Sequence, residues 1–354
     1  MEFEKELKMN SRKVLVTGAT GLIGTKLVEK LLARGYAVRG MGRRPKPEYP
    51  KGCTVPPENL WEHPEFEYFQ GDVCDADSVL RAMEGCRFVL HLAAYAKNWS
   101  KDKSIFYRFN VDAMENVFRA AKALNVERIV WTSTIVTLGP TAPGVCGDEM
   151  MERITDRYFT EYEETKSIAE KKAFEWVERE GLPLVIVNPT RVFGPGQLSE
   201  SNAVVDLIRQ YCRGTFPILL NYGRNVGNYV LVDDVAEGHI LALERGRIGE
   251  KYILGSENYS LGEFFRTVGE EYGKKRFQLP IYKIIPLCVA NGMKLSAELF
   301  GIYPPITPGW VKTFLADWTF SCDKARRELG YEPVSVREGI RRSIEWLREL
   351  KEIR

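Results

Sequence analysis

The sequence predicts an α/β protein with a doubly wound parallel sheet, followed by a smaller and mostly helical region. Short apolar segments typical of strands alternate with helical segments through the first half of the chain. The first strand runs directly into a glycine-rich turn and then a helix, as in dinucleotide-binding sheets of the Rossmann type. The alternation ends near Phe193, where Gly194-Pro195-Gly196 interrupts the pattern.

The elements of the first half follow one another in strand–helix order. Strands are expected where short runs rich in Val, Ile, Leu and Phe are bounded by polar or turn residues. These runs are 13–17, 36–41, 66–69, 87–91, 128–131 and 182–187. Helices are expected where apolar residues recur every three or four positions, over 22–33, 76–83, 105–124 and 162–179.

The second half has a different organisation. Helices are predicted near 203–213, over 235–245 with Asp233-Asp234 as its cap, and over 336–350, and a strand over 229–232. We expect three parts: a tail of residues 1–11, a cofactor-binding Rossmann domain, and a substrate-binding region. The Rossmann domain takes residues 12–194 and about 227–255, and the substrate-binding region takes 195–226 and 256–354.

Composition excludes several classes of protein. The net charge of +2 gives no reason to expect a nucleic acid or an anionic membrane as partner. Seven cysteines without a Cys-x-x-Cys pair indicate free thiols in a reducing compartment, and we expect a cytoplasmic protein. Three distant histidines without ligand spacing argue against a metal site. The apolar stretch 281–302 contains too many polar residues to span a bilayer, which leaves a membrane-surface helix or a core helix.

The turn after the first strand carries glycines at positions 18, 21 and 24. Glycine permits positive φ and a close approach of backbone to pyrophosphate, and the following helix N-terminus favours an anion. An ordinary turn between a strand and a helix is the alternative. We expect a dinucleotide to contact Gly18, Thr20, Gly21, Leu22, Ile23 and Gly24.

The end of the second strand predicts which dinucleotide is bound. NAD-binding sheets place a carboxylate there for the ribose 2′-hydroxyl, whereas this chain has Gly42 followed by Arg43 and Arg44. Guanidinium groups can grip a 2′-phosphate, so NADP(H) is predicted, although the two arginines could simply solvate a loop. Asp72, after the third strand, could accept a hydrogen bond from adenine or cap a turn.

Tyr162 and Lys166 stand at positions i and i+4 of a predicted helix. The helix follows the fifth strand, whose end carries Thr132-Ser133-Thr134, and ligands bind at such strand ends in parallel sheets. A neighbouring ammonium would lower the pKa of the Tyr162 phenol, which could then protonate a carbonyl oxygen as hydride arrives.

Other polar residues have supporting roles in this hypothesis. Thr134 would hydrogen-bond the same oxygen, with Ser133 as the substitute, and Lys166 would also hold the nicotinamide ribose. Asn110 could relay protons through water or make a structural hydrogen bond. The alternative for Tyr162 and Lys166 is a solvated pair on a helix surface.

These residues resemble the extended short-chain dehydrogenase/reductase family, also called the NAD-dependent epimerase/dehydratase family, most closely its dihydroflavonol-4-reductase-like and hopanoid-associated epimerase-like members. The resemblance implies that Thr134, Tyr162 and Lys166 are catalytic, that His91 is structural, and that the protein forms a homodimer. It also implies a wall around the cofactor, largely of backbone. That wall comprises Asp72, Val73, Leu92, Ala93, Ala94, Thr132, Pro189, Thr190 and Val192. The matching segments are 17–24, 71–73, 91–94, 110–111, 132–134, 162/166, 188–190 and 229–234.

Departures from the family pattern narrow the substrate. Nucleotide-sugar dehydratases place Asp-Glu after the catalytic threonine, where this chain has Ile135-Val136, so dehydration is not expected. Sugar-nucleotide enzymes carry Arg-Asp where Gly227-Asn228 stands here, and they usually have asparagine at the position of Arg191. Arg191 or Arg224 could substitute for the missing arginine. The residues expected to face the substrate are largely apolar: Tyr95, Trp99, Val136, Leu138 and Phe193, with Arg191 beside them. Core packing is the alternative for Val136 and Phe193.

The predicted function is NADP(H)-dependent reduction of a ketone or aldehyde on an apolar small molecule, reversible as alcohol oxidation. Two alternatives stay open at this point. One is a nucleotide-sugar epimerase of the same family, which retains its cofactor. The other is an NADP-binding sensor without catalysis, against which Thr134, Tyr162 and Lys166 argue, because a sensor has no use for a proton donor.

Overall fold

The computed structural model describes residues 12–43, 60, 62–97, 99–155, 157–216, 218–304 and 306–354. The predicted tail and Arg44 lie outside these residues. A seven-stranded sheet in the order β10-β6-β5-β4-β1-β2-β3 forms the centre, and every neighbouring pair in it is parallel. Its strands are β1 (Lys13–Thr17), β2 (Ala37–Gly42), β3 (Phe66–Gln70), β4 (Phe88–His91), β5 (Arg128–Thr132), β6 (Leu184–Pro189) and β10 (Lys251–Leu254).

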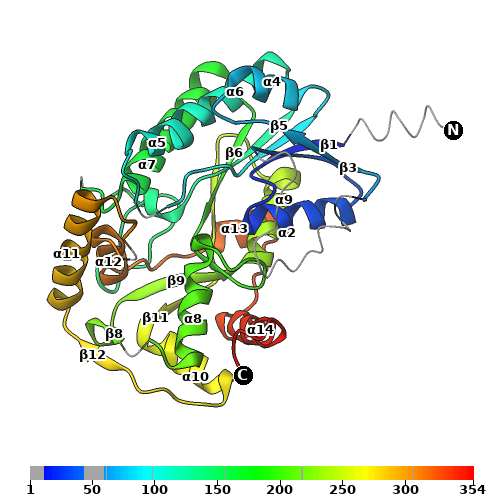
Figure 1. Cartoon of the computed structure of the whole chain (residues 1–354). Coiled ribbons are helices and arrows are strands. Elements are labelled where there is room, and N and C mark those ends of the chain that lie inside the picture. Colours follow the sequence, from blue (N-terminus) through cyan, green and yellow to red (C-terminus); the bar gives the residue numbers. More distant parts are fainter. Residues whose placement is uncertain are drawn as a thin grey trace.

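Helices cover both faces of this sheet, so the predicted doubly wound architecture is confirmed (Figure 1). One face packs against α2 (Leu22–Ala33), α9 (Val232–Arg245) and α13 (Asp323–Leu329). The other packs against α4 (Ala76–Met83), α6 (Ala113–Ala123) and α7 (Glu161–Glu180). Strands buried on both faces must be apolar throughout, which explains the Val- and Ile-rich runs in the sequence.

The second half adds strands as well as helices. A three-stranded sheet and a two-stranded sheet stand beside the main one, and a third apolar core fills the space between them and the helices. The small sheets contain β7 (Arg191–Phe193), β9 (Val226–Leu231) and β11 (Glu257–Ser260), and β8 (Ile218–Leu220) and β12 (Leu279–Ile281). The helices are α8 (Ala203–Arg213), α10 (Leu261–Tyr272), α11 (Ile284–Phe300), α12 (Pro308–Leu315) and α14 (Val336–Glu349).

Two predicted elements differ from the structure, and one strand of the main sheet was not predicted. The helix expected over 105–124 consists of α5 (Ser104–Tyr107), a π-helical turn at Arg108–Asp112, and α6. Helix α9 begins at Val232, so Asp233 and Asp234 lie in its first turn instead of capping it, where carboxylates still favour the helix dipole. Strand β10 was not predicted, because its short run after Gly249 carries little pattern of its own.

The described residues show no helix that is both long and apolar enough to cross a membrane. They also contain no group of three or more His, Cys, Asp or Glu side chains that could hold a metal ion. The six cysteines within the described ranges are free thiols.

Candidate active site

The glycine turn between β1 and α2 is as tight as its sequence predicts. Gly18 has φ +72°, and a Cβ on it would lie 2.9 Å from the backbone nitrogen of Ala93. A Cβ on Gly24 would lie 2.1 Å from the carbonyl oxygen of Gly18. A side chain is therefore excluded at Gly18 by the backbone conformation and by contact, and at Gly24 by contact alone.

The N-terminus of α2 is left open by its cap. Gly21 is the N-cap, so no side chain bonds the first amide groups of the helix, and the first turn contains no carboxylate. The amide of Gln197 donates to the carbonyl of Thr20 at 2.9 Å, which fixes the turn from the opposite side. Free N–H groups and the helix dipole at this end suit a pyrophosphate.

A cavity of 680 Å³ opens in front of this turn. Its wall brings together the glycine turn, Val73, the ends of β4 and β5, Tyr162 and the stretch after β6. Most of the predicted cofactor residues thus lie around one space. Asp72 and Lys166 do not line it, and the predictions missed Met41, Gly71, Ala96, Phe109, Glu200 and Ser201. Gly71 belongs to the matching segment 71–73, whereas the other missed residues carry no motif that would single them out.

The end of β2 shapes one side of the cavity. A Cβ on Gly42 would lie 2.6 Å from the hydroxyl of Tyr68, so the carboxylate typical of NAD-binding sheets would require the Tyr68 side chain to shift. Arg43 is exposed at the cavity wall, with its guanidinium 5.0 Å from the centre of the Phe109 ring. Asp72 instead accepts a hydrogen bond from the amide of Cys74 at 3.0 Å and so caps a turn.

Tyr162 and Thr134 face each other across the cavity wall. Tyr162 lies in the first turn of α7, whose N-terminus is fixed by the Thr160 hydroxyl accepting from the amide of Glu163 at 3.1 Å. Burial raises the pKa of Tyr162 to about 12, and a hydrogen bond with Thr134 acts in the opposite direction. The predicted lowering of this pKa is wrong for the polypeptide alone, because desolvation of the phenolate outweighs other influences.

Lys166 is only 2% exposed and does not form a solvated surface pair. Its ammonium donates to the carbonyl of Thr132 at 2.8 Å and lies 4.2 Å from the centre of the Trp131 ring. Burial lowers the pKa of Lys166 to about 7, and the charge of Glu170 acts to raise it. The lysine is therefore anchored to the end of β5, immediately behind the cavity.

Glu170 is a buried residue that the sequence analysis missed. Its Oε2 atom accepts hydrogen bonds from Ser133 at 2.5 Å, Thr137 at 2.8 Å and the Asn188 amide at 2.8 Å. The Asn188 amide also donates to the carbonyl of Thr134 at 3.0 Å. The network fixes the turn that carries Thr134, and it engages the Ser133 hydroxyl that was considered as a substitute donor. The sequence signal for Glu170 was its position four residues after Lys166, one turn further along the same helix.

Two buried histidines hold strand ends in place, His91 between β4 and β1 and His239 between α9 and β5. His91 Nδ1 lies 2.7 Å from the hydroxyl of Thr17, and the hydroxyl also accepts from the amide of Ala93 at 3.2 Å. His239 Nε2 lies 2.8 Å from the hydroxyl of Thr132, while its Nδ1 donates to a backbone carbonyl. Burial lowers the pKa of His91 to about 3 and that of His239 to about 4, so both are neutral.

Asn110 makes structural hydrogen bonds from the π-helical turn. Its Oδ1 accepts from the amide of Tyr95 at 2.8 Å, and its Nδ2 donates to the Thr165 hydroxyl at 3.0 Å. The wider turn moves this side chain toward α7 and β4. Asn110 therefore positions Tyr95, which lines the cavity, and its amide is engaged by Thr165 on α7.

The residues expected to face a substrate separate into two groups. Tyr95 lines the cavity, and Trp99 packs edge-on against Tyr303 with ring centres 5.8 Å apart. Phe193 is fully buried among core aromatic rings, so the prediction that it faces substrate is wrong. Core packing also describes Val136 and Leu138, which belong to a small apolar cluster.

Arg191 is committed to protein partners. Its guanidinium donates to the Tyr229 hydroxyl at 3.1 Å and to the Thr313 carbonyl at 3.3 Å, and it lies 4.6 Å from the centre of the Phe314 ring. It does not line the cofactor cavity. The role of a pyrophosphate ligand for Arg191 therefore receives no support from its geometry.

A second cavity of 520 Å³ adjoins the first, with Glu200 in the wall of both. It lies between α8 and α12. Leu198, Phe216 and Trp310 give it apolar surface, and Glu200 lies at the junction with the first cavity. The rest of the wall is mostly polar and includes Asp206, Arg209 and Gln210. This space is the candidate for the part of a substrate that extends beyond the reacting carbonyl.

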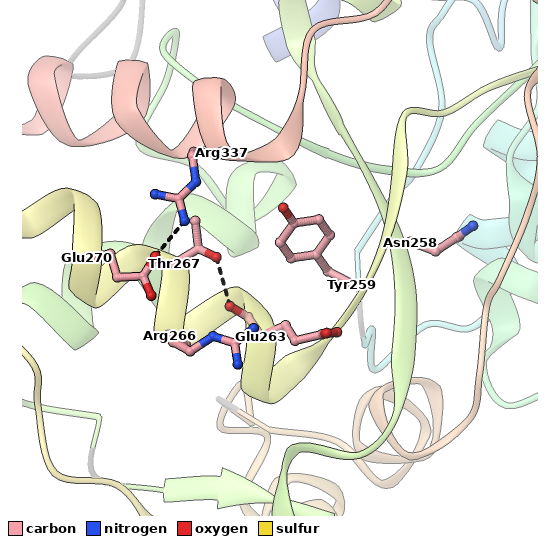
Figure 2. A pocket seen from close by; sticks show the side chains of 7 residues that line it. All are labelled: Asn258, Tyr259, Glu263, Arg266, Thr267, Glu270 and Arg337. Carbon is pink, nitrogen blue, oxygen red and sulfur yellow. Dashed lines mark hydrogen bonds and ion pairs between the residues drawn. The ribbon is translucent and has the colours of Figure 1, made fainter.

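A third cavity, of 570 Å³, lies apart from these two on β11, α10 and α14 (Figure 2). Its wall is polar, and Arg337 pairs with Glu270 at 2.5 Å while Thr267 donates to the Glu263 carbonyl at 3.0 Å. No residue predicted for the site lines it. Glu270 pairs with Arg337, and Glu263 accepts a hydrogen bond from the hydroxyl of Ser260. This cavity is therefore not assigned to the active site.

Comparison with known proteins shows the family of the chain. Residues 14–255 match the sequence model of the NAD dependent epimerase/dehydratase family. The chain is 30% identical to a Synechocystis protein named "Putative dihydroflavonol 4-reductase", over 94% of this chain and 93% of that protein. It is 29% identical to a Mycobacterium tuberculosis 3 beta-hydroxysteroid dehydrogenase/Delta 5-->4-isomerase, over 91% and 86% of the two chains.

Solved structures share the whole architecture. The Thermus thermophilus UDP-glucose 4-epimerase complex with NAD superposes with a TM-score of 0.72 at 26% identity, covering 95% of this chain and 99% of that one. The family match spans the glycine turn, Thr134, Tyr162 and Lys166. The chain belongs to the NAD dependent epimerase/dehydratase family, the extended short-chain dehydrogenases/reductases, whose members bind NAD(P).

Proposed function

We propose that this protein is an NADP(H)-dependent oxidoreductase that reduces a ketone or aldehyde on an apolar small molecule by hydride transfer. The reverse reaction oxidises the corresponding alcohol. The observation that carries the proposal is the placement of Tyr162 and Thr134 on the wall of the cavity that contains the glycine turn. A proton donor, a second hydroxyl and a cofactor cradle thereby face one space.

The residues around the cavity fit a dinucleotide phosphate. The open N-terminus of α2 suits the pyrophosphate, and the hydroxyl of Thr190 is buried in the cavity wall without a hydrogen-bond partner among the described residues. Gly42 supplies no competing carboxylate, and Arg43 supplies the positive charge for a 2′-phosphate. When bound, NADPH supplies the hydride.

The polypeptide supplies the proton. Because the pKa of Tyr162 is raised to about 12, its phenol holds a proton at neutral pH and can donate it to a carbonyl oxygen. Thr134 stabilises the negative charge that develops on that oxygen. Lys166 keeps a cation close behind both groups and holds the end of β5 in place. Alcohol oxidation needs the phenolate and is therefore favoured at higher pH.

The substrate class follows from the walls of the cavities. The adjoining cavity offers the apolar side chains of Leu198, Phe216 and Trp310 beside polar ones, and Arg191 is engaged by Tyr229 and Thr313. The names of the two relatives refer to a dihydroflavonol and a hydroxysteroid, both of them polycyclic compounds. We therefore infer a carbonyl or secondary alcohol on a polycyclic, largely apolar compound.

A substrate panel tests this function. Flavanonol and steroid ketones are offered to the purified protein with NADPH or NADH, and consumption of the reduced cofactor is followed at saturating substrate. We expect turnover with NADPH, and Tyr162→Phe should lower kcat roughly 10²- to 10⁴-fold while cofactor affinity stays the same. Tyr158→Phe on the preceding loop is the matched control. Wild-type turnover by Tyr162→Phe would refute the mechanism.

Cofactor preference is tested at Arg43. Arg43→Ala should raise the KM for NADPH by roughly 10-fold or more and leave the KM for NADH unchanged, since a charged hydrogen bond is worth about 1.5–3 kcal/mol. Arg81→Ala, on the exposed side of α4, is the matched control. Equal changes for both cofactors would mean that Arg43 does not recognise the 2′-phosphate.

The alternative function is a nucleotide-sugar epimerase, favoured by the likeness to the Thermus thermophilus enzyme. An epimerase would interconvert nucleotide sugars with tightly retained cofactor and no net consumption of NADPH. Cofactor binding without any turnover, unaffected by Tyr162→Phe, would instead indicate a sensor.

A further inference from the structure

Helix α11 presents an apolar stripe to its surroundings. Ile285, Val289, Leu295 and Leu299 recur at intervals of four or six, and Phe300 follows Leu299, so the five lie on one side of the helix. All five are exposed, Leu299 to 69% and Phe300 to 73%. Surface helices of globular proteins ordinarily turn such a stripe toward the core, and this one turns it outward.

The helix is attached to the protein through a different side. Only Ala290 and Ala297 of α11 are buried, and its main neighbour is α12. Figure 1 shows α11 in orange at the outer edge of the molecule, with α12 between it and the rest of the fold. The apolar stripe is therefore not covered by any element in the described chain.

The exposed apolar side chains are concentrated around this helix. Eleven of the 17 large apolar side chains exposed within the described residues belong to residues 277–303. We call these eleven side chains the α11 surface. Monomeric soluble proteins rarely expose large apolar patches unless another surface binds there. The α11 surface is Phe277, Leu279, Tyr282, Ile284, Ile285, Val289, Leu295, Leu299, Phe300, Ile302 and Tyr303.

The same segment is strongly basic. Residues 274–303 contain five Lys or Arg and a single carboxylate, a formal charge of +4, whereas the other residues together carry −2. Lys294 pairs with Glu298 at 3.7 Å. Lys274 and Lys283 are exposed, with no carboxylate in ion-pairing distance among the described residues. A partner that is apolar and negatively charged at its boundary would complement this surface.

We propose that the α11 surface binds an anionic lipid bilayer, with α11 lying flat in the headgroup region. The outward stripe enters the boundary of the acyl chains, and lysines at its margin meet lipid phosphates. Tyr282 and Tyr303 stand at the two ends of α11, where amphipathic rings suit a membrane interface. A symmetric contact with a second copy would bring two segments of charge +4 together.

The α11 surface reaches the rim of the cofactor cavity. Tyr303 packs against Trp99 and donates a hydrogen bond to Glu200, which lines the cavity. A protein held at a bilayer by this surface would have its cavity entrance beside the lipid. Membrane binding itself does not depend on the proposed reaction and is measured without turnover.

Co-sedimentation of the full-length protein with lipid vesicles tests the proposal. Vesicles of phosphatidylcholine alone are compared with vesicles that also contain phosphatidylglycerol. We expect binding to the anionic vesicles, and Leu295→Asp/Leu299→Asp should lower it roughly 10-fold or more. The matched control Ile154→Asp/Ile248→Asp replaces exposed apolar residues elsewhere and should bind like the wild type.

Charge reversal tests the electrostatic part separately. Lys274→Glu/Lys283→Glu should weaken binding roughly 10-fold or more, and added salt should weaken wild-type binding, whereas Lys171→Glu/Lys351→Glu should not weaken it. Circular dichroism and thermal unfolding show whether each variant is folded.

Three results would overturn the proposal. The first is wild-type protein that stays in solution with both kinds of vesicle. The second is binding that the stripe variants retain. The third is a dimer, seen by sedimentation velocity, that Leu295→Asp/Leu299→Asp dissociates without any vesicle binding, which would identify a second copy as the occupant.

Discussion

Helices α7 and α11 distribute their side chains in opposite ways. Helix α7 buries the charged residues Glu163, Lys166 and Glu170, whereas α11 buries two alanines and exposes its large apolar residues. Each buried charge of α7 has partners: Glu163 pairs with Arg153, Lys166 with the Thr132 carbonyl, and Glu170 with three donors. The apolar stripe of α11 has no cover in the described chain.

The contrast shows that hydropathy alone does not place a helix. Charges are tolerated inside when hydrogen bonds replace water, and this arrangement holds the catalytic groups of α7 in fixed positions. An apolar stripe remains exposed when the surface that packs against it belongs to another molecule or assembly. Four predictions test this contrast, beginning with the interior of α7.

The largest effect is expected at Lys166. Lys166→Met removes the buried ammonium behind Tyr162 and should lower kcat roughly 10²- to 10⁴-fold. Burial already lowers the pKa of Lys166 to about 7, so the loss of its charge should change the free energy of unfolding only a little. The main effect should therefore be on kcat. Lys171→Met, on the exposed side of the same helix, is the control for kinetics and denaturation. An unchanged kcat in Lys166→Met would contradict the catalytic assignment.

The next effect is expected at Glu170. Glu170→Ala removes the acceptor of three hydrogen bonds, those donated by Ser133, Thr137 and Asn188, and should lower the free energy of unfolding by about 3 kcal/mol. The control Glu178→Ala, exposed on the same helix, should have little effect in the same denaturant titration.

Glu170→Gln provides a second, independent measurement. It keeps an acceptor but removes the charge that raises the pKa of Lys166. The loss of activity with rising pH, as Lys166 deprotonates, should therefore begin at lower pH than in the wild type. A pH profile of Glu170→Gln that matches the wild type would mean that Glu170 has only a structural role.

Acid should weaken the fold through the two buried histidines. Their folded-state pKa values of about 3 and about 4 lie below the usual 6.5, so their contribution to stability is complete above pH 6.5 and is lost as pH falls. Each contributes a slope of about 1.4 kcal/mol per pH unit. Asp234, with its pKa raised to about 6 by burial, acts in the opposite direction below that pH.

The measurement is the free energy of unfolding as a function of pH between 6.5 and 4. His239→Gln should reduce the slope, while His63→Gln, at a partly exposed position, should leave it unchanged. Equal slopes in the wild type and in His239→Gln would mean that His239 is not buried in its neutral form.

The smallest effect is expected on α11. Leu299→Ala should change the free energy of unfolding by no more than about 0.5 kcal/mol, since the residue is exposed. The same substitution at the buried Leu184 of β6 should cost about 2–5 kcal/mol. A large loss of stability in Leu299→Ala would mean that the Leu299 side chain is buried within the protein. The contrast between α7 and α11 would then not hold.

The sequence predicted those parts of the site that depend on neighbouring residues. Gly18 and Gly24 occupy the positions that a tight turn requires, and Tyr162 and Lys166 lie one turn apart on a helix. The same reasoning did not find Glu170, since its partners Ser133 and Asn188 come from two other strands. It also placed Phe193 in the substrate site, although the third core covers this residue.

By itself, the sequence determined the fold class and the character of the cofactor turn and catalytic helix, because periodicity, glycine spacing and the i, i+4 relation act over a few residues. Only the tertiary structure decided that burial raises the pKa of Tyr162, that Arg191 is already engaged, and that the stripe of α11 faces outward. Desolvation, hydrogen-bond partners and coverage of an apolar face all depend on residues distant in the chain, which meet only when the protein folds.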